Sequence, residues 1–165
     1  MRLFFTIWNV LVEDGNFDDL GIGNKFQEAL EVNELQDIKE INNTRTAFYH
    51  IKDNLYDVNA YVYRVTRLSI FIEVDGVLLT IDNKKEYQFM NKGSYYMFRA
   101  FLNCDIWNWF GLSWSKENEY LFDEIEIEGT IKSLKYKENG YDKFSYYLVE
   151  LEVTNRVDKS ILYEK

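Results

Sequence analysis

The sequence LSIFIEVDGVLLTID, residues 68–82, decides the fold class of this chain. Its centre, Asp75-Gly76, is a dipeptide typical of two-residue β-hairpin turns, because both turn positions need a positive φ. With the turn placed there, six apolar side chains share one face of the ribbon in three opposed pairs: Val74 with Val77, Ile72 with Leu79, and Ile70 with Ile81. Turn chemistry and hydrophobic pattern agree, and together they predict a hairpin with one buried face.

A second hairpin is predicted around Asn139-Gly140, with arms at 124–138 and 141–154. Strict pairing across that turn mixes the two faces of the ribbon, since it places Ile127 opposite Glu152. One extra residue near Lys132-Ser133 restores the apolar face, with these opposed pairs: Ile131 with Tyr147, Gly129 with Val149, Ile127 with Leu151, and Ile125 with Val153. The sequence therefore predicts a β-bulge, which bends a long hairpin in the way that small barrels need for closure.

Other segments also have the two-residue period of strands. Residues 3–12 are apolar on nearly both faces, which is typical of a central strand. Residues 44–52 and 58–65 alternate, whereas 26–38 fits a strand or a helix, with a strand favoured over 26–32. The one clear helix candidate is 94–103, where Ser94 could cap the N-terminus. Four apolar residues would then share a helix face: Met97, Phe98, Phe101 and Leu102.

These elements predict a mainly β protein, either a curved antiparallel sheet or a small barrel or sandwich, with one or two helices. An α+β arrangement is the alternative. The chain has 165 residues and no proline, and no Gly/Ser-rich linker divides it, so residues 1–165 are expected to form a single domain. With 47% hydrophobic and 18% aromatic residues, the composition excludes a disordered or collagen-like chain.

The chain is acidic, with 28 Asp and Glu against 19 Lys and Arg, a net charge of −9. Such a chain repels phosphate backbones, so direct nucleic-acid binding is not expected. One cysteine cannot form an internal disulfide, which favours a reducing compartment. The apolar run after Arg2 ends in Glu13-Asp14-Gly15 instead of a small-residue cleavage site. We therefore expect a cytoplasmic protein that does not cross a membrane.

No pattern of residues indicates catalysis or cofactor binding. A single His and a single Cys cannot build the usual zinc site. Gly21-Ile22-Gly23 lacks a third glycine and a Walker pattern, and is interpreted as a tight turn. His50 and Cys104 have no marked catalytic partner, so both are interpreted as structural. The sequence thus predicts no enzyme, no metal site and no cofactor, and a carboxylate-pair glycosidase is the least favoured alternative.

The aromatic content of residues 95–114 is the most informative functional signal. Eight of these twenty positions are aromatic, and three of the four tryptophans lie among them. Four acids follow closely in the sequence. We predict that these residues form a protein-binding site, with core packing of the aromatic cluster as the alternative: Trp107, Trp109, Trp114, Glu117, Glu119, Asp123 and Glu124.

The resulting hypothesis is a non-catalytic inhibitor that binds a partner with a basic surface, for example a nuclease. Residues with AT-rich codons (Phe, Tyr, Met, Ile, Asn and Lys) make up 69 of the 165 positions, which points to an AT-rich genome. A phage or mobile-element anti-defence protein, similar in role to anti-CRISPR proteins, and a toxin immunity protein both fit. The alternatives are a ligand-binding β-barrel or sandwich and a phage structural or assembly protein.

Overall fold

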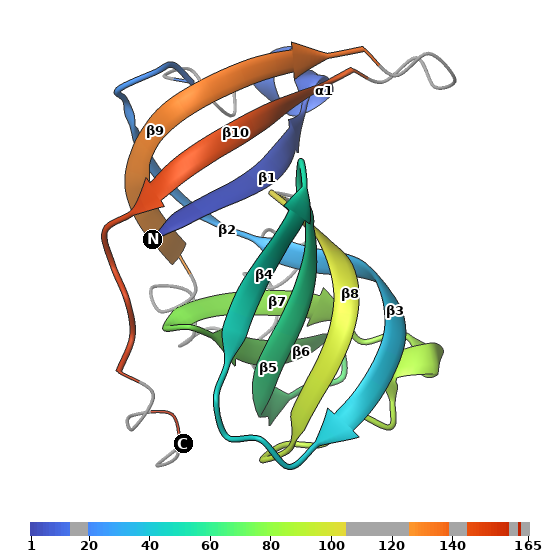
Figure 1. The fold of residues 1–165 in the computed structure, drawn as a ribbon. Helices are drawn as coiled ribbons and strands as arrows, with labels where there is room; N and C mark the ends of the chain where they lie inside the picture. The colour runs from blue at the N-terminus through green and yellow to red at the C-terminus, as the bar shows by residue number, and fades with distance from the viewer. Residues whose placement is uncertain (14–19, 105–125, 139–144, 159–161, 163–165) are drawn as a thin grey trace.

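The computed structural model describes residues 1–13, 20–104, 126–138, 145–158 and 162 (Figure 1). Ten strands join in one sheet, in the order β2-β9-β10-β1-β8-β3-β7-β6-β5-β4. This confirms a mainly β fold. The elements in chain order are β1 (Arg2–Trp8), α1 (Asn9–Glu13), β2 (Lys25–Ala29), β3 (Glu31–Ile41), β4 (Ala47–Lys52), β5 (Leu55–Val65), β6 (Ser69–Val74), β7 (Val77–Asp82), the 3-10 turn η1 (Lys85–Tyr87), β8 (Tyr95–Asn103), β9 (Glu126–Lys137) and β10 (Tyr146–Val153).

Five of the strands close into a barrel. The run β8-β3-β7-β6-β5 returns on itself, because β5 also pairs with β8. All neighbours in this ring are antiparallel except β3 and β7, which are parallel and meet at the pair Glu31–Thr80. In Figure 1, β4, β5, β8 and β3 lie side by side, and β6 and β7 cross behind them.

The remaining strands, β2, β9, β10 and β1, form a four-stranded extension of the sheet above the barrel (Figure 1). Only Leu30 separates β2 from β3, so one extended stretch of chain runs from this extension into the barrel. On the other side, β1 lies parallel to β8 through the pair Thr6–Asn103. Phe5 of β1 and Val149 of β10 belong to the same hydrophobic core cluster as the barrel side chains.

The hairpin predicted at 68–82 is confirmed. Strands β6 and β7 pair with Val74 opposite Val77, Ile72 opposite Leu79 and Ile70 opposite Ile81, and all six side chains are buried. Both turn residues, Asp75 and Gly76, have positive φ, as a two-residue primed turn requires.

A neighbouring segment near the C-terminus holds the tip of this hairpin in place. The Val157 amide donates to the Gly76 carbonyl oxygen at 2.8 Å. Arg156 pairs with the Asp75 carboxylate. A Cβ on Gly76 would lie 3.1 Å from the Arg156 Cβ, so this tight approach depends on glycine.

The second hairpin has the predicted bulge but a different register. The pairing shifts by one residue at Lys132, between Ser133–Glu150 and Ile131–Leu151. Ile131 was expected opposite Tyr147 and instead faces Leu151, a slip of four residues along β10. The described pairing ends at Lys137 and Tyr146, so the predicted register is wrong, and the predicted turn at Asn139-Gly140 lies outside the described residues. Since the slip is even, the described side chains keep their expected faces, and Ile125 of the predicted pairs lies outside the described residues.

The helix predicted over 94–103 is wrong, because residues 95–103 form β8. Tyr96, Phe98 and Ala100 are buried on one face, whereas Met97 and Arg99 are exposed on the other. β8 pairs with β3 on one side and β5 on the other, so its backbone hydrogen bonds are satisfied by neighbours far away in sequence. That tertiary pairing outweighs the local helical spacing of the apolar residues.

The other expected strands are largely confirmed. The strand predicted over 3–12 ends at Trp8, where the short helix α1 takes over, and it lies inside the sheet between β10 and β8. Residues 26–38 form strands rather than a helix, in β2 and β3.

Gly21 and Gly23 flank a turn, with the Asn24 N–H donating to the Gly21 carbonyl oxygen. Within the described residues, no helix is long and apolar enough to span a membrane.

Candidate functional site

The binding residues predicted from the sequence fall outside the described part of the chain. They are Trp107, Trp109, Trp114, Glu117, Glu119, Asp123 and Glu124. Of the same aromatic stretch, Tyr96 and Phe98 are core residues of β8, which confirms core packing for these two. By sequence, the segments outside the described residues contain 10 of the 28 acids but only 4 of the 19 bases, so much of the negative charge lies there.

His50 and Cys104 lie in different surroundings, one exposed and one buried. The exposed His50 ring stacks on Phe4 at 4.6 Å between centroids, and its Nε2 lies 2.7 Å from the Asp53 carbonyl oxygen. The Cys104 side chain is buried at the end of β8, with 1% of its surface exposed. Among the described residues, no group of three or more His, Cys, Asp or Glu side chains could hold a metal ion.

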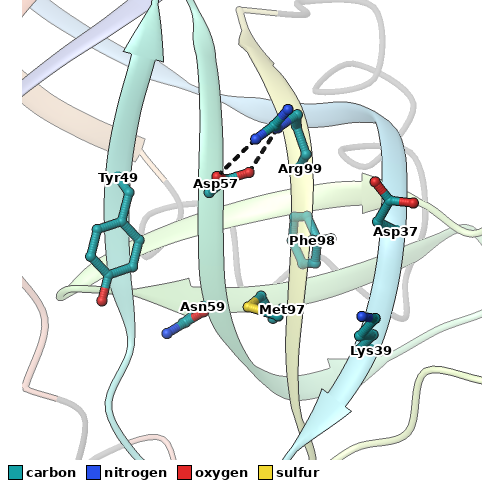
Figure 2. Close-up of a pocket in the computed structure, with 8 residues that line it drawn as sticks. All are labelled: Asp37, Lys39, Tyr49, Asp57, Asn59, Met97, Phe98 and Arg99. Carbon is teal, nitrogen blue, oxygen red and sulfur yellow. Dashed lines mark hydrogen bonds and ion pairs between the residues drawn. The ribbon is translucent and has the colours of Figure 1, made fainter.

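The outer surface of β4, β5, β8 and β3 is called here the outer barrel face. A shallow hollow of about 440 Å³ lies on it (Figure 2), lined by Asp37, Lys39, Tyr49, Asp57, Asn59, Met97, Phe98 and Arg99. The strand registers place Tyr49, Asp57 and Arg99 in one row across three strands, with Asn59 and Met97 in the next. Tyr49 is 55% exposed and Met97 is 40% exposed.

A bidentate ion pair lies at the centre of this hollow (Figure 2). The Arg99 Nε and Nη2 donate to the two carboxylate oxygens of Asp57 at 2.8 and 3.0 Å. Hydrogen bonds from Arg99 lower the pKa of Asp57, and the same bonds raise the pKa of Arg99. Both side chains are nearly half exposed, so this pair fixes the orientation of Arg99 more than it stabilises the fold.

Two irregular positions bend β3 along the edge of the outer barrel face. Glu34 and Asp37 have φ of 54° and 53°, in the left-handed region that non-glycine residues rarely adopt. The pairing with β8 shifts at both places. A regular strand points successive side chains to opposite faces, whereas a bulge redirects one of them. Here the bulges direct Asp37 and Glu34 into two different hollows.

The second hollow, about 240 Å³, lies where β1 meets the barrel and is called here the junction cavity. It continues the outer barrel face along β8, from Met97 and Arg99 to Phe101 and Asn103. Three of its lining residues are aromatic, four are uncharged polar residues and one is acidic: Trp8, Phe101, Tyr146, Thr6, Asn33, Asn54, Asn103 and Glu34.

A hydrogen-bonded network fixes the polar wall of the junction cavity. Asn103 Oδ1 accepts hydrogen bonds from Thr6 Oγ1 and from Asn54 Nδ2, the latter at 3.1 Å. Asn103 Nδ2 donates to Asn33 Oδ1 at 2.7 Å, and Asn33 Nδ2 donates to a carboxylate oxygen of Glu31 at 3.3 Å. Thr6, Asn54 and Asn103 are nine-tenths buried or more, so the network is held rigidly.

This network could not be found from the sequence, because its members come from β1, β3, β8 and the turn between β4 and β5. The sequence predicted Asn103 at the end of a helix, which would separate it from β1 and β3. The only sequence signal was the presence of polar side chains within otherwise apolar strands, such as Thr6 in β1.

Comparison with known proteins adds no family to this description. The chain shows no significant similarity to any protein-family model, to any curated protein or to any solved structure.

Proposed function

We propose that this chain is a non-catalytic inhibitor that binds a protein partner with a basic surface in the cytoplasm. A nucleic-acid-handling enzyme such as a nuclease is the partner that best fits its charge. The role would be that of an anti-defence protein of a phage or mobile element, or of an immunity protein against a toxin. The outer barrel face is the observation that carries this proposal.

The residue types on the outer barrel face are those of protein interfaces. Aromatic residues, Met and Arg are enriched in interfaces, and Tyr49, Met97 and Arg99 lie together on this face. The Asp57 carboxylate holds the Arg99 guanidinium in place, which lowers the entropy cost of using it in a contact.

The overall charge supports the choice of partner. A net charge of −9 attracts a basic protein over long distances and raises the rate of encounter. We also propose that four acids form a rim around the tryptophans that lie near them in sequence: Glu117, Glu119, Asp123 and Glu124. Charge reversal of three of these acids tests their part in binding.

A ligand-binding role is the second candidate, and the hollow of about 440 Å³ on the outer barrel face favours it. Inside the barrel, Val62, Ile72 and Leu79 pack together in the core cluster. A small ligand would therefore use an outer hollow. A neutral sugar or nucleoside that binds without any protein partner would support this second candidate against the first.

The test of the inhibitor function is capture of a partner from a low-GC bacterial lysate, with mass spectrometry and then kinetics on the purified pair. Tyr49→Glu and Met97→Glu place a charge on the outer barrel face. Ile22→Glu is the matched control, since Ile22 is 70% exposed in the turn before β2.

The proposal expects a basic partner whose association slows as salt rises, with binding lost in both face variants and kept in Ile22→Glu. A partner that binds all three variants equally would exclude the outer barrel face. An acidic partner, or salt-independent association, would contradict the inhibitor function as stated.

A further inference from the structure

The junction cavity combines three features that together select a ligand. Its polar wall consists of oxygen-bearing side chains held in a network, its remaining wall is aromatic, and its only charged lining residue is acidic. None of the residues described as lining it is a Lys, Arg or His. The cavity therefore favours a cation over an anion, and a phosphate or carboxylate ligand would meet Glu34 with no positive charge to offset it.

The acceptors of the cavity are fixed before any ligand arrives. Asn54 Nδ2 donates to the Leu102 carbonyl oxygen and to Asn103 Oδ1, both at 3.1 Å, which sets the orientation of the Asn54 amide. Asn54 is 9% exposed, and its Oδ1 accepts no hydrogen bond within the described part of the chain. An acceptor held in a fixed orientation on the wall of the cavity can receive a hydrogen bond from a ligand donor.

The bulge in β3 adds the charge. In a regular strand Asn33 and Glu34 would point to opposite faces, yet both line this cavity. The left-handed backbone at Glu34 makes this arrangement possible at an energetic cost of its own. Trp8, which is 41% exposed, supplies an aromatic surface of the kind that attracts cations, as do Phe101 and Tyr146.

The size of the cavity limits the occupant. About 240 Å³ is smaller than the roughly 300–1,000 Å³ of sites that hold free small molecules and cofactors. One side chain of a partner protein fits that scale better. We propose that the junction cavity receives the guanidinium group of an arginine side chain from the basic partner, an inference that rests on the proposed function.

Arginine suits this cavity better than lysine does. The planar guanidinium carries five N–H donors in a fixed arrangement and stacks on aromatic rings, whereas the lysine ammonium is a strongly hydrated point charge. Asn54 Oδ1 and the Glu34 carboxylate can accept from different edges of one planar group, while Trp8 contacts its face.

The test uses the full chain and a small probe in place of the unknown partner. N-acetyl-arginine amide is titrated into ¹⁵N-labelled protein, and shifts are followed at the Trp8 indole N–H and at the side-chain amides of Asn54 and Asn103. The neutral isostere N-acetyl-citrulline amide and the amine N-acetyl-lysine amide serve as controls. A single side chain is expected to bind with a Kd of about 10 mM, so the titration extends beyond that concentration.

Variants decide between a specific cavity and general attraction to an acidic protein. Glu34→Gln is expected to weaken the arginine probe about five-fold, and Trp8→Ala about ten-fold or more. Glu40→Gln, an exposed acid on the same strand outside the cavity, should bind like the parent. Melting temperatures show whether each variant is folded.

Saturable shifts with arginine amide, weaker shifts with lysine amide and none with citrulline amide would support the proposal. Equal binding of arginine and citrulline probes, or an unchanged affinity in Glu34→Gln, would overturn it. The titration uses no partner protein, so a negative result refutes only the proposal that the junction cavity binds an arginine side chain. The inhibitor function is then still tested by capture of a partner. If the arginine probe binds but no basic partner is captured, the inhibitor function is refuted, whereas arginine binding by the junction cavity stands.

Discussion

The β6–β7 and β9–β10 hairpins differ in what surrounds their strands. Strands β6 and β7 have six residues each, and nearly all of their side chains are buried. Strands β9 and β10 have twelve and eight residues, and each has three or four buried positions among more accessible ones. In the first hairpin, pairing begins directly at the turn, with Val74 opposite Val77. In the second, pairing begins at Lys137 and Tyr146, with eight residues between them in the sequence.

The difference shows where register information lies. A two-residue turn ties the two arms together, so the turn sets the register of β6–β7. A longer connection leaves the register of β9–β10 to the strands, and their two-residue period is satisfied equally well by slips of any even number. Gly129 then distinguishes between registers, because a Cβ there would lie 2.6 Å from the Glu152 carbonyl oxygen and 2.7 Å from Leu151 Cγ.

The substitution expected to have the largest effect is Gly129→Ala. The added methyl group meets backbone, which cannot move without disturbing the β9–β10 pairing, so the free energy of unfolding should fall by about 3 kcal/mol. Urea unfolding monitored by tryptophan fluorescence measures the change. Thr130→Ala, at the next and half-exposed position, is the control and should cost much less. If the Gly129→Ala protein is as stable as the parent, Gly129 does not set the register of β9 and β10.

A smaller effect is expected at the tip of the first hairpin. Gly76 has a φ of +80°, and a Cβ would approach Arg156 and Val157, so Gly76→Ala should cost about 1–2 kcal/mol. Gly23 also has a positive φ, +85°, but nothing lies within 4 Å of an added Cβ. Gly23→Ala therefore measures the cost of the backbone conformation without any steric clash. Thermal melts of both variants give the comparison. An equal cost at the two glycines would mean that the C-terminal contact does not hold the turn.

The β2–β9 edge should also respond to pH. Burial, and then the neighbouring charge of Glu126, raise the pKa of Glu28 from 4.5 to about 7. The folded state therefore holds this proton more tightly than the unfolded state, and stability is lost as the pH rises from about 4.5 through 7. Glu28→Gln should raise the melting temperature at pH 8 and leave it unchanged at pH 4.

Glu128→Gln, an exposed position on β9, is the control for this pH effect. A Glu28→Gln protein that gains no stability at pH 8 relative to pH 4 would show that the carboxylate of Glu28 is well solvated.

The smallest effect on stability, with a clear effect on binding, is expected from charge reversal at Glu117, Glu119 and Asp123 together. Acids near an interface act mainly on the rate of encounter, so association with the captured partner should slow and its salt dependence should flatten. Reversal of the exposed acids Glu40, Glu86 and Glu138 is the matched control. Unchanged association at low salt would show that these three acids take no part in binding. Surface plasmon resonance at several salt concentrations provides the rates.

Local patterns in the sequence were sufficient for part of the fold. The β6–β7 hairpin follows from Asp75-Gly76 and the apolar residues on either side, because the turn and its flanking pairs are contiguous. The bulge at Lys132 follows from the break in alternation between two apolar runs. A mainly β fold follows from the prevalence of the two-residue period over the described chain.

Tertiary structure decided the rest, because the deciding contacts join residues far apart in sequence. Residues 95–103 have apolar positions that suit either period, and pairing with β3 and β5 selects the strand. Closure of the barrel depends on the single parallel meeting of β3 and β7, which no local pattern encodes. Thr6, Asn54 and Asn103 become a network only when β1 lies beside β8. Period and turn chemistry are properties of neighbouring residues, whereas register, closure and the junction cavity are properties of distant ones.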